Sequence, residues 1–258
     1  MNARLVAPAV MGVLMLAAWE AVVRGFAIPP YILPGPLLVA ETLVDDWGTL
    51  LPSLLVTLRI TLEALAAAVL VGGVLAILFS LSRWIELSLF PYAIILQVTP
   101  IVAIAPLIII WANNVELSLL ICAWLVAFFP ILSNTILGLR SVDPNLLELF
   151  RLYGAGRWRT LVDLRLPAAL PYFLGGLRIS GGLALIGAVV AEFVAGTGGN
   201  ASGLAWRILE SGYQLQIPRM FAALALISLS GIAIYLVLNA LSYLLLRRWH
   251  ESALAEAG

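Results

Sequence analysis

Four stretches of this chain are long and entirely free of Asp, Glu, Lys and Arg. They are residues 64–82, 87–115, 117–139 and 220–246. At about 1.5 Å per residue, a helix of this length crosses a hydrocarbon core of roughly 30 Å. The runs therefore predict membrane-spanning helices.

The overall composition agrees with a membrane protein. Hydrophobic residues make up 63% of the chain and charged residues 11%, and the mean hydropathy is +1.08. A soluble domain of 258 residues would not cover so much apolar surface with so few charges. Two further apolar stretches carry charges, residues 5–26 and residues 168–195, and they bring the predicted number of membrane helices to six. We expect an all-α polytopic protein with one transmembrane domain over residues 1–258 and no soluble domain.

The first apolar stretch has two interpretations. Arg4 followed by an uncharged run is compatible with a signal peptide, which would be removed. However, Glu20 and Arg24 follow without a small-x-small cleavage signal. We therefore favour a retained first helix.

The arginines predict the orientation of the helices. With the N-terminus inside, nine arginines lie on the cytoplasmic side: Arg4, Arg83, Arg140, Arg151, Arg157, Arg159, Arg165, Arg247 and Arg248. About four lie on or near the other side: Arg24, Arg59, Arg207 and Arg219. Because positive residues accumulate in cytoplasmic loops, we expect both termini and the connection over residues 139–167 to be cytoplasmic.

Several kinds of catalytic site are excluded by the residues that the chain contains. It has no lysine, so it has neither a phosphate-binding loop of the GxxxxGK[ST] type nor a lysine Schiff base. Its one cysteine, Cys122, forms no internal disulfide, and its one histidine, His250, follows the last helix. A buried Ser-His-acid triad or a histidine-built metal site is not expected. We predict a non-catalytic chain with no cofactor of its own.

Residues 143–167 form a long connection with recognisable helix signals. Asp143 suits an N-cap, Pro144 a first helical position, and Gly154 or Gly156 a helix C-terminus. A second short helix is expected to end at Pro167. The first helix would present an apolar face for docking into a partner's groove, formed by Leu146, Leu149, Phe150 and Tyr153. The alternative is a plain loop whose arginines contact anionic headgroups of membrane lipids.

The same segment resembles a known motif. Residues 148–167 are similar to the cytoplasmic E-A-A motif of type I ABC importer permeases, which ends in I-x-L-P. Glu148 takes the place of the acid and Gly154 that of the glycine, and Leu164, Leu166 and Pro167 match the end. The sequence departs from the motif at two positions, since Leu149 and Phe150 replace two alanines. Arg151 and Ala155 complete the predicted ATPase-coupling set.

Other stretches resemble one branch of this family, which includes permeases for nitrate, taurine, alkanesulfonates and thiamine-pyrimidine precursors. They read IPPYILPGP, QVTPIVAIAPLIIIW, LPAALPYFLGGLRISGGLA and AEFVAG. The resemblance implies the type I permease fold in the bacterial cytoplasmic membrane. It also implies a homodimer that works with two ATPase subunits, which bind ATP and Mg²⁺, and with an extracytoplasmic substrate-binding protein. It implies no nucleic-acid partner.

Polar residues in the predicted helices are candidates for a translocation pathway. Gln97, Thr99 and Pro100 interrupt a long apolar run, and Asn134 lies near the inner end of the fourth helix. Such groups either hydrogen-bond a neighbouring helix or face a cavity, and packing is the more common case. Glu192 lies near the outer end of the fifth helix, where a gating or docking role and a water-exposed position are both open. The glycines of that helix favour close packing.

Two other charged groups are expected to have structural roles. Arg178 is expected to pair with Glu63 or with cytoplasmic carbonyl groups. Arg59 and Glu63, four residues apart, are expected to pair with each other.

A proton-coupled secondary transporter is the main alternative function. It would use membrane carboxylates such as Glu63 and Glu192 as proton relays, and it would not need the capped cytoplasmic helix. The substrate itself stays open among nitrate, a sulfonate, a pyrimidine vitamin precursor and a flavin. The stretch EFVAGTGGNASGLAWRILESGYQLQIPRMF resembles most the vitamin-precursor type.

Overall fold

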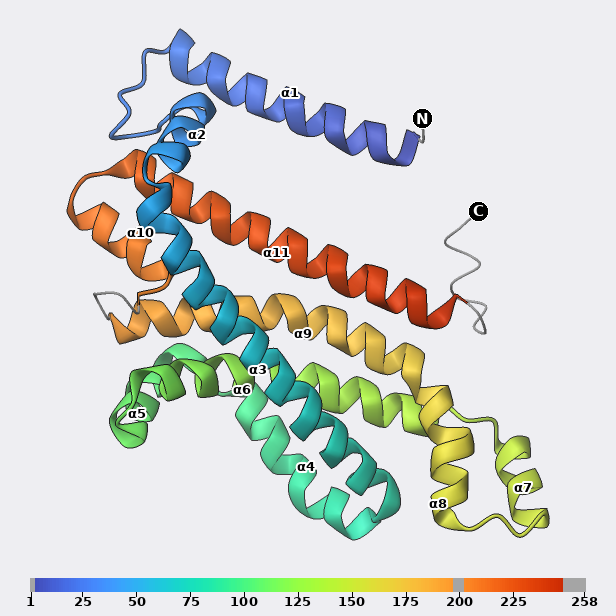
Figure 1. Cartoon of the computed structure of the whole chain (residues 1–258). Helices are drawn as coiled ribbons and strands as arrows, with labels where there is room; N and C mark the ends of the chain where they lie inside the picture. Colours follow the sequence, from blue (N-terminus) through green and yellow to red (C-terminus); the bar gives the residue numbers. More distant parts are fainter. Residues whose placement is uncertain (1–2, 197–201, 248–258) are drawn as a thin grey trace. The chain divides into compact units, whose positions relative to one another are not determined.

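A computed structural model describes residues 3–196 and 202–247 of the chain, and every element in these residues is a helix (Figure 1). His250, which the sequence analysis places after the last helix, lies outside this range. The helices separate into two compact units, and the long helices α3 (Trp47–Leu81) and α11 (Ile217–Leu246) contribute residues to both.

The first unit contains residues 1–56 and 196–229. Its elements are α1 (Ala3–Gly25), α2 (Pro36–Asp45), the beginning of α3, α10 (Leu204–Tyr213) and the beginning of α11. Its core is apolar and combines residues of α2, α3, α10 and α11, with Leu50 and Leu204 fully buried. Pro218 is the second residue of α11, a position that suits proline because the N–H groups of the first helical turn have no intrahelical partner.

The second unit contains residues 57–195 and 230–258. Between the parts of α3 and α11 it holds the following elements: α4 (Arg83–Val98), α5 (Ile101–Ala112), α6 (Val115–Arg140), α7 (Pro144–Leu152), α8 (Arg157–Thr160), the π-helix η1 (Leu161–Arg165) and α9 (Leu166–Ala195). Its centre is the packing of α6 against α9, which brings their backbones close enough for Ser180 Oγ to donate to the Ala127 carbonyl at 2.6 Å.

Small residues make this close packing of α6 and α9 possible. A Cβ added to Gly176 would lie 2.7 Å from the Pro130 carbonyl oxygen, and one added to Gly187 would lie 2.8 Å from the Ala123 Cα. Residues that let two backbones approach are typical of helix packing in membranes. The predicted packing role is therefore confirmed for these two glycines. Gly175 and Gly182 have no such neighbour among the described residues.

Five helices of the described residues are long and apolar enough to cross a membrane, and a sixth span results if α4 and α5 are counted as one. The two helices meet at an angle of 105° around Thr99 and Pro100, and Figure 1 shows this sharp turn. The sequence predicted a single span over residues 87–115, which is wrong as a straight helix. Pro100 has no N–H for the Leu96 carbonyl, so the helix does not continue through it.

Two further local expectations fail. The second cytoplasmic helix does not end at Pro167, because α8, η1 and α9 form one continuous helical segment over residues 157–195. The N–H of Leu166 donates to the Leu161 carbonyl, five residues back, and this widened turn gives room for the proline ring. The second failure is α2, which the sequence did not predict. It begins at Pro36, a favourable first helical residue.

Candidate functional site

The helix α7 has both of its ends closed by local hydrogen bonds. Asp143 is the N-cap, and its carboxylate accepts from the Asn145 N–H at 2.8 Å. At the other end Gly154 has a φ of +70°, the left-handed conformation that glycine adopts freely. The Ala155 N–H donates to the Phe150 carbonyl at 2.9 Å and the Gly154 N–H to that of Arg151 at 3.0 Å. These two bonds form a Schellman motif.

The apolar residues of α7 divide between two faces. Leu149 and Tyr153 are 45% and 83% exposed, and Leu146 is exposed beside them. Leu147 and Phe150 are half-buried toward the rest of the unit. The predicted docking face is thus exposed except for the half-buried Phe150, and Leu149, Phe150 and Tyr153 line a cavity of about 320 Å³ between α7 and the α8–η1 segment. Glu148 and Arg151 are also exposed.

A non-helical turn over residues 153–156 joins α7 to α8, and α8, η1 and the membrane helix α9 are continuous. Leu164 lies in η1, and Leu166 and Pro167 are the first residues of α9. Arg165 donates from Nη1 to the Ser80 carbonyl in the last turn of α3, at 3.3 Å. A cation at a helix C-terminus compensates the free carbonyl groups there. This hydrogen bond joins η1 to the end of α3.

A second cavity, of about 360 Å³, lies at the break between α4 and α5. Gln97, Thr99 and Pro100, three of the predicted pathway residues, contribute to its wall. Most of the remaining wall is apolar, and it includes Phe129 of α6 and Leu183 of α9. Three predicted residues are therefore brought together at one cavity.

Backbone groups at this break lack their normal helical partners. The Leu96 carbonyl would bond residue 100, which is a proline, and α5 starts at Ile101 with no side-chain cap. The Thr99 hydroxyl donates to the Ile95 carbonyl at 2.7 Å. At membrane depth, such a backbone is tolerated where it is covered by protein or lines a water-filled cavity. The break thus favours a hydrated space at this position.

The other two predicted pathway residues do not line this cavity. The Asn134 side-chain amide donates to the Pro130 carbonyl of its own helix at 2.9 Å, so it satisfies the backbone next to a proline. Glu192 is only 2% exposed, and it accepts from the Thr57 hydroxyl at 2.8 Å. The water-exposed interpretation of Glu192 is therefore wrong. A buried carboxylate is stable only when it is hydrogen-bonded in this way.

The charged residues of the second unit form structural pairs. Arg59 Nε lies 2.8 Å from Glu63 Oε1, as the sequence predicted, and Arg59 Nη2 lies 2.7 Å from Glu116 Oε1. Arg178 does not pair with Glu63. Its guanidinium instead donates to Asn239 at 3.0 Å and Ser242 at 3.2 Å, two side chains of α11.

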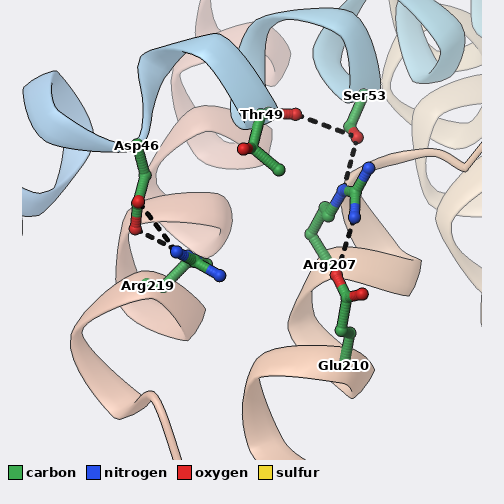
Figure 2. Close-up of polar contacts among 6 residues, drawn as sticks. All are labelled: Asp46, Thr49, Ser53, Arg207, Glu210 and Arg219. Atoms are coloured by element: carbon green, nitrogen blue, oxygen red, sulfur yellow. Dashed lines mark hydrogen bonds and ion pairs between the residues drawn. The ribbon is translucent and has the colours of Figure 1, made fainter. Parts of the chain in front are cut away.

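The first unit holds a polar network that the sequence analysis did not predict (Figure 2). Arg219 at the beginning of α11 donates to both carboxylate oxygens of Asp46, at 2.6 and 2.8 Å. Arg207 of α10 pairs with Glu210 at 2.7 Å and donates to the Ser53 hydroxyl at 2.9 Å. The Arg219 hydrogen bonds hold the pKa of the Asp46 carboxyl below its ordinary value, although partial burial acts in the opposite direction.

Residues 68–251 match the family model of the binding-protein-dependent transport system inner membrane component. This match covers more than half of the chain. The chain belongs to this family of membrane permeases. It is a transport subunit, and it is a multi-pass protein of the cytoplasmic membrane.

Three curated relatives match this permease over nearly its whole length. A riboflavin transport system permease protein, RibX of Chloroflexus aurantiacus, is 36% identical over 93% of this chain and 88% of its own length. A probable ABC transporter permease protein of Haemophilus influenzae is 34% identical over 91% of this chain and 94% of its own. The formylaminopyrimidine transport permease protein ThiX of Halalkalibacterium halodurans is 31% identical over 93% and 94%.

A solved structure supports the fold of the permease. A crystal structure of an amino acid ABC transporter with histidines superposes with a TM-score of 0.65, covering 81% of this chain and 97% of the other. The sequence identity is 19%, so this similarity concerns the fold alone. It agrees with the all-helical membrane architecture predicted from the apolar runs.

The two arginine pairs of the first unit differ in how far the sequence could reveal them. Arg207 and Glu210 are three residues apart on a helix, a spacing that places two side chains side by side, and this signal was available. Asp46 and Arg219 are separated by 173 residues, and no local pattern in one sequence connects them. The sequence analysis used Arg207 and Arg219 only to predict which side of the membrane each connection lies on. It did not predict the partners of these two arginines.

Proposed function

We propose that this permease imports a small heterocyclic solute as the membrane part of an ATP-driven transporter. Two copies form the pathway, separate ATPase subunits dock on α7, and an extracytoplasmic binding protein delivers the solute. The observation that carries the proposal is α7 itself. It is a short helix with both ends capped and an exposed apolar face, and a short turn over residues 153–156 joins it to the helical segment that continues into α9. Membrane helices that are merely connected do not need such an element.

The proposed coupling is mechanical. ATP binding draws the two ATPase subunits together, and each carries the α7 helix docked in its groove. Because α8, η1 and α9 are continuous, the displacement reaches the membrane helix beside the α4–α5 cavity. The pathway then alternates between outward and inward access. In this scheme both termini and α7 lie in the cytoplasm.

The exposed face of α9 supports a homodimer. Gly175, Ile179, Gly182 and Ile186 follow one another at spacings of four, three and four residues, so they share one face. Both isoleucines are more than half exposed, and a Cβ added to either glycine would meet no atom of the described residues within 4 Å. Small residues seven apart with apolar neighbours suit close packing of two membrane helices.

The cavity at the helix break supports a neutral, aromatic solute over a permanent anion. Its wall contains the Gln97 amide and the Phe129 ring but, among the described residues, no arginine. A nitrate or sulfonate group would need a cation or several hydrogen-bond donors to replace the water that it loses on binding. A pyrimidine or flavin ring has amide-like groups for Gln97 and a flat face for an aromatic ring. The relatives named for riboflavin and formylaminopyrimidine transport support the same class.

Reconstituted uptake tests this function. The permease, its ATPase and its binding protein would be placed in liposomes, and entry of riboflavin and of a formylaminopyrimidine would be followed with ATP inside. We expect uptake that requires ATP and the binding protein, with taurine and nitrate as poor competitors. Flux that is driven by a proton gradient through the permease alone would contradict the proposal and favour a secondary transporter.

Gln97 provides a sharper test of the pathway. Replacing Gln97→Leu removes the amide from the cavity without a large change in volume, and we expect uptake to fall by up to about tenfold, the value of one lost hydrogen bond. ATPase association should be unchanged. Tyr92→Phe is the matched control, because Tyr92 is an exposed polar residue of α4 that does not line the cavity. Equal uptake by Gln97→Leu and the control would place the pathway elsewhere.

A further inference from the structure

A third cavity lies on the opposite side of α7 from its exposed docking face. It has a volume of about 250 Å³ and is enclosed by the last turn of α3, by α7 and by the α8–η1 segment. Leu147 and Arg151, four residues apart on α7, line it. The exposed residues Leu149 and Tyr153 do not. The two faces of α7 therefore border different surroundings.

The wall of this cavity is strongly cationic. Arg151, Arg157 and Arg165 all line it, and no acidic residue of the described part of the chain does. The nearest acid along the helix, Asp163, pairs instead with Arg159 at 3.4 Å, outside the cavity. Within residues 3–196 and 202–247, the salt bridges of the structure involve neither Arg151 nor Arg157. Three positive charges thus face one space whose described wall offers no compensating carboxylate.

The position of the cavity relates it to the membrane. Ser80 and Leu81, which complete its wall, are the last residues of α3, a helix of membrane-spanning length and composition. Arg165 is held there by its hydrogen bond to the Ser80 carbonyl. At about 1.5 Å per residue, the 35 residues of α3 exceed a hydrocarbon core of roughly 30 Å, so this helix reaches into the headgroup region. Leu81 and Leu147 supply apolar wall beside the arginines.

We propose that this cavity binds the phosphate headgroup of an anionic phospholipid. Arginine binds phosphate oxygens through planar pairs of N–H donors, and it keeps its charge under all physiological conditions. Basic pockets between membrane helices are known sites for such headgroups. A volume several times the roughly 30 Å³ of a water molecule accommodates a phosphate group. The acyl chains would lie along the apolar surface of the membrane helices.

The lipid would stabilise the segment that carries α7. One phosphate shared by Arg151 of α7, Arg157 of α8 and Arg165 of η1 connects three elements that otherwise meet around an open cavity. We expect the bound lipid to hold α7 in its docking position. Anionic lipid content should then affect transport without any contact between lipid and solute.

Lipid retention by purified permease tests the site. The protein would be incorporated in nanodiscs of phosphatidylethanolamine with a minor fraction of phosphatidylglycerol, and then extracted into mild detergent. Retained lipid would be counted by native mass spectrometry. The test variant is Arg151→Gln with Arg157→Gln, since both side chains are exposed. The control is Arg159→Gln, which removes one positive charge from α8, the helix of Arg157, outside the cavity, so it is matched in charge to the single variant Arg157→Gln measured beside it.

We expect phosphatidylglycerol to be retained in preference to phosphatidylethanolamine. Each arginine near a membrane surface changes lipid affinity by about fivefold, so the double variant should bind phosphatidylglycerol on the order of 25-fold more weakly. The control should stay within about twofold of the unmodified protein. Melting temperatures measured in parallel separate loss of the lipid from loss of the fold.

Three outcomes would overturn the proposal. Equal phosphatidylglycerol retention by the double variant and the control would show that these arginines do not form the site. Competition by soluble glycerol phosphate as effective as that by the lipid would assign the cavity to a free anion. Loss of ATPase binding by the double variant, with lipid retention unchanged, would assign the arginines to the protein partner.

Discussion

Gly154 is the residue on which the shape of the docking helix most directly depends. Its φ of +70° closes the Schellman motif, and a Cβ added at this position would meet no atom of the described residues within 4 Å. A larger side chain therefore has room at this position, but it disfavours the left-handed backbone conformation that the motif requires. For a residue with a Cβ, the left-handed conformation costs about 1–2 kcal/mol.

We expect Gly154→Val to loosen the end of α7 and to lower the amount of solute imported per ATP hydrolysed. Gly154→Asn should retain most of the coupling, because asparagine adopts this conformation more readily. Gly156→Ala is the control, since its φ of −67° suits any residue. The measurement is uptake and hydrolysis in the same liposomes. Full coupling in the valine variant would argue against a role of α7 geometry.

Asp46 makes the stability of the first unit dependent on pH. The pKa of its carboxyl is lowered in the folded protein by Arg219, so the ion pair stabilises the fold above the unfolded-state pKa. This contribution is lost as the pH falls through the lowered folded-state pKa. We expect Asp46→Asn to cost about 1.5–3 kcal/mol at neutral pH and progressively less in acid.

Thermal unfolding in detergent over a range from neutral to strongly acidic pH measures this effect. The matched control is Asp45→Asn, because Asp45 is exposed and adjacent in sequence. The melting curves of Asp46→Asn and the unmodified protein should converge at low pH, and those of the control should coincide throughout. A difference that persists unchanged in acid would mean that Asp46 contributes through its shape and not its charge.

The pairing of α6 with α9 depends on glycine at specific positions of α9. Gly187 lies so close to Ala123 that a methyl group would require the backbones to move apart, and overpacking of this kind costs about 1–3 kcal/mol. We expect Gly187→Ala and Gly176→Ala to lower the melting temperature. Gly182→Ala has open space around its Cβ within the described residues and should leave the melting of the monomer unchanged.

The same comparison separates packing within the chain from packing between copies. If α9 forms the homodimer contact, Gly182→Ala should weaken dimers in cross-linking or light-scattering measurements while the helix pair inside each copy stays intact. A variant that lowers neither dimer content nor uptake would remove the α9 face from the proposed interface.

Much of the element pattern was predictable from sequence, because apolar run length and helix caps are local signals. The Asp143–Pro144 start of α7 and its glycine end were predicted from single residues, and both are confirmed. The break between α4 and α5 was not predicted as a turn. A proline in an apolar run indicates an interruption, but the 105° angle depends on packing against α6 and α9. The helix α2 is apolar but has only 10 residues, so a search for runs of membrane-spanning length does not find it.

For the whole molecule, composition and the long uncharged apolar runs predicted the class correctly. The family match and the solved structure confirm a multi-helix membrane permease. Residue partners were harder to predict, since Arg178 bonds α11 instead of Glu63, and Glu192 is buried instead of exposed. Such contacts join residues far apart in the chain. No local pattern in a single sequence identifies these contacts. The roles of the coupling residues and of Gln97 stay predictions.

The π-helix between α8 and α9 sets the rotation of α7 and α8 relative to α9. A π turn holds one more residue than an α turn, and each residue of an α-helix rotates the chain by about 100°. Deleting Val162 would restore regular α geometry there and turn α7 by roughly that angle about the axis of α9. The helix would still be formed and capped, but its apolar face would point away from the partner. The one extra residue of the π turn therefore sets the direction in which the apolar face of α7 points.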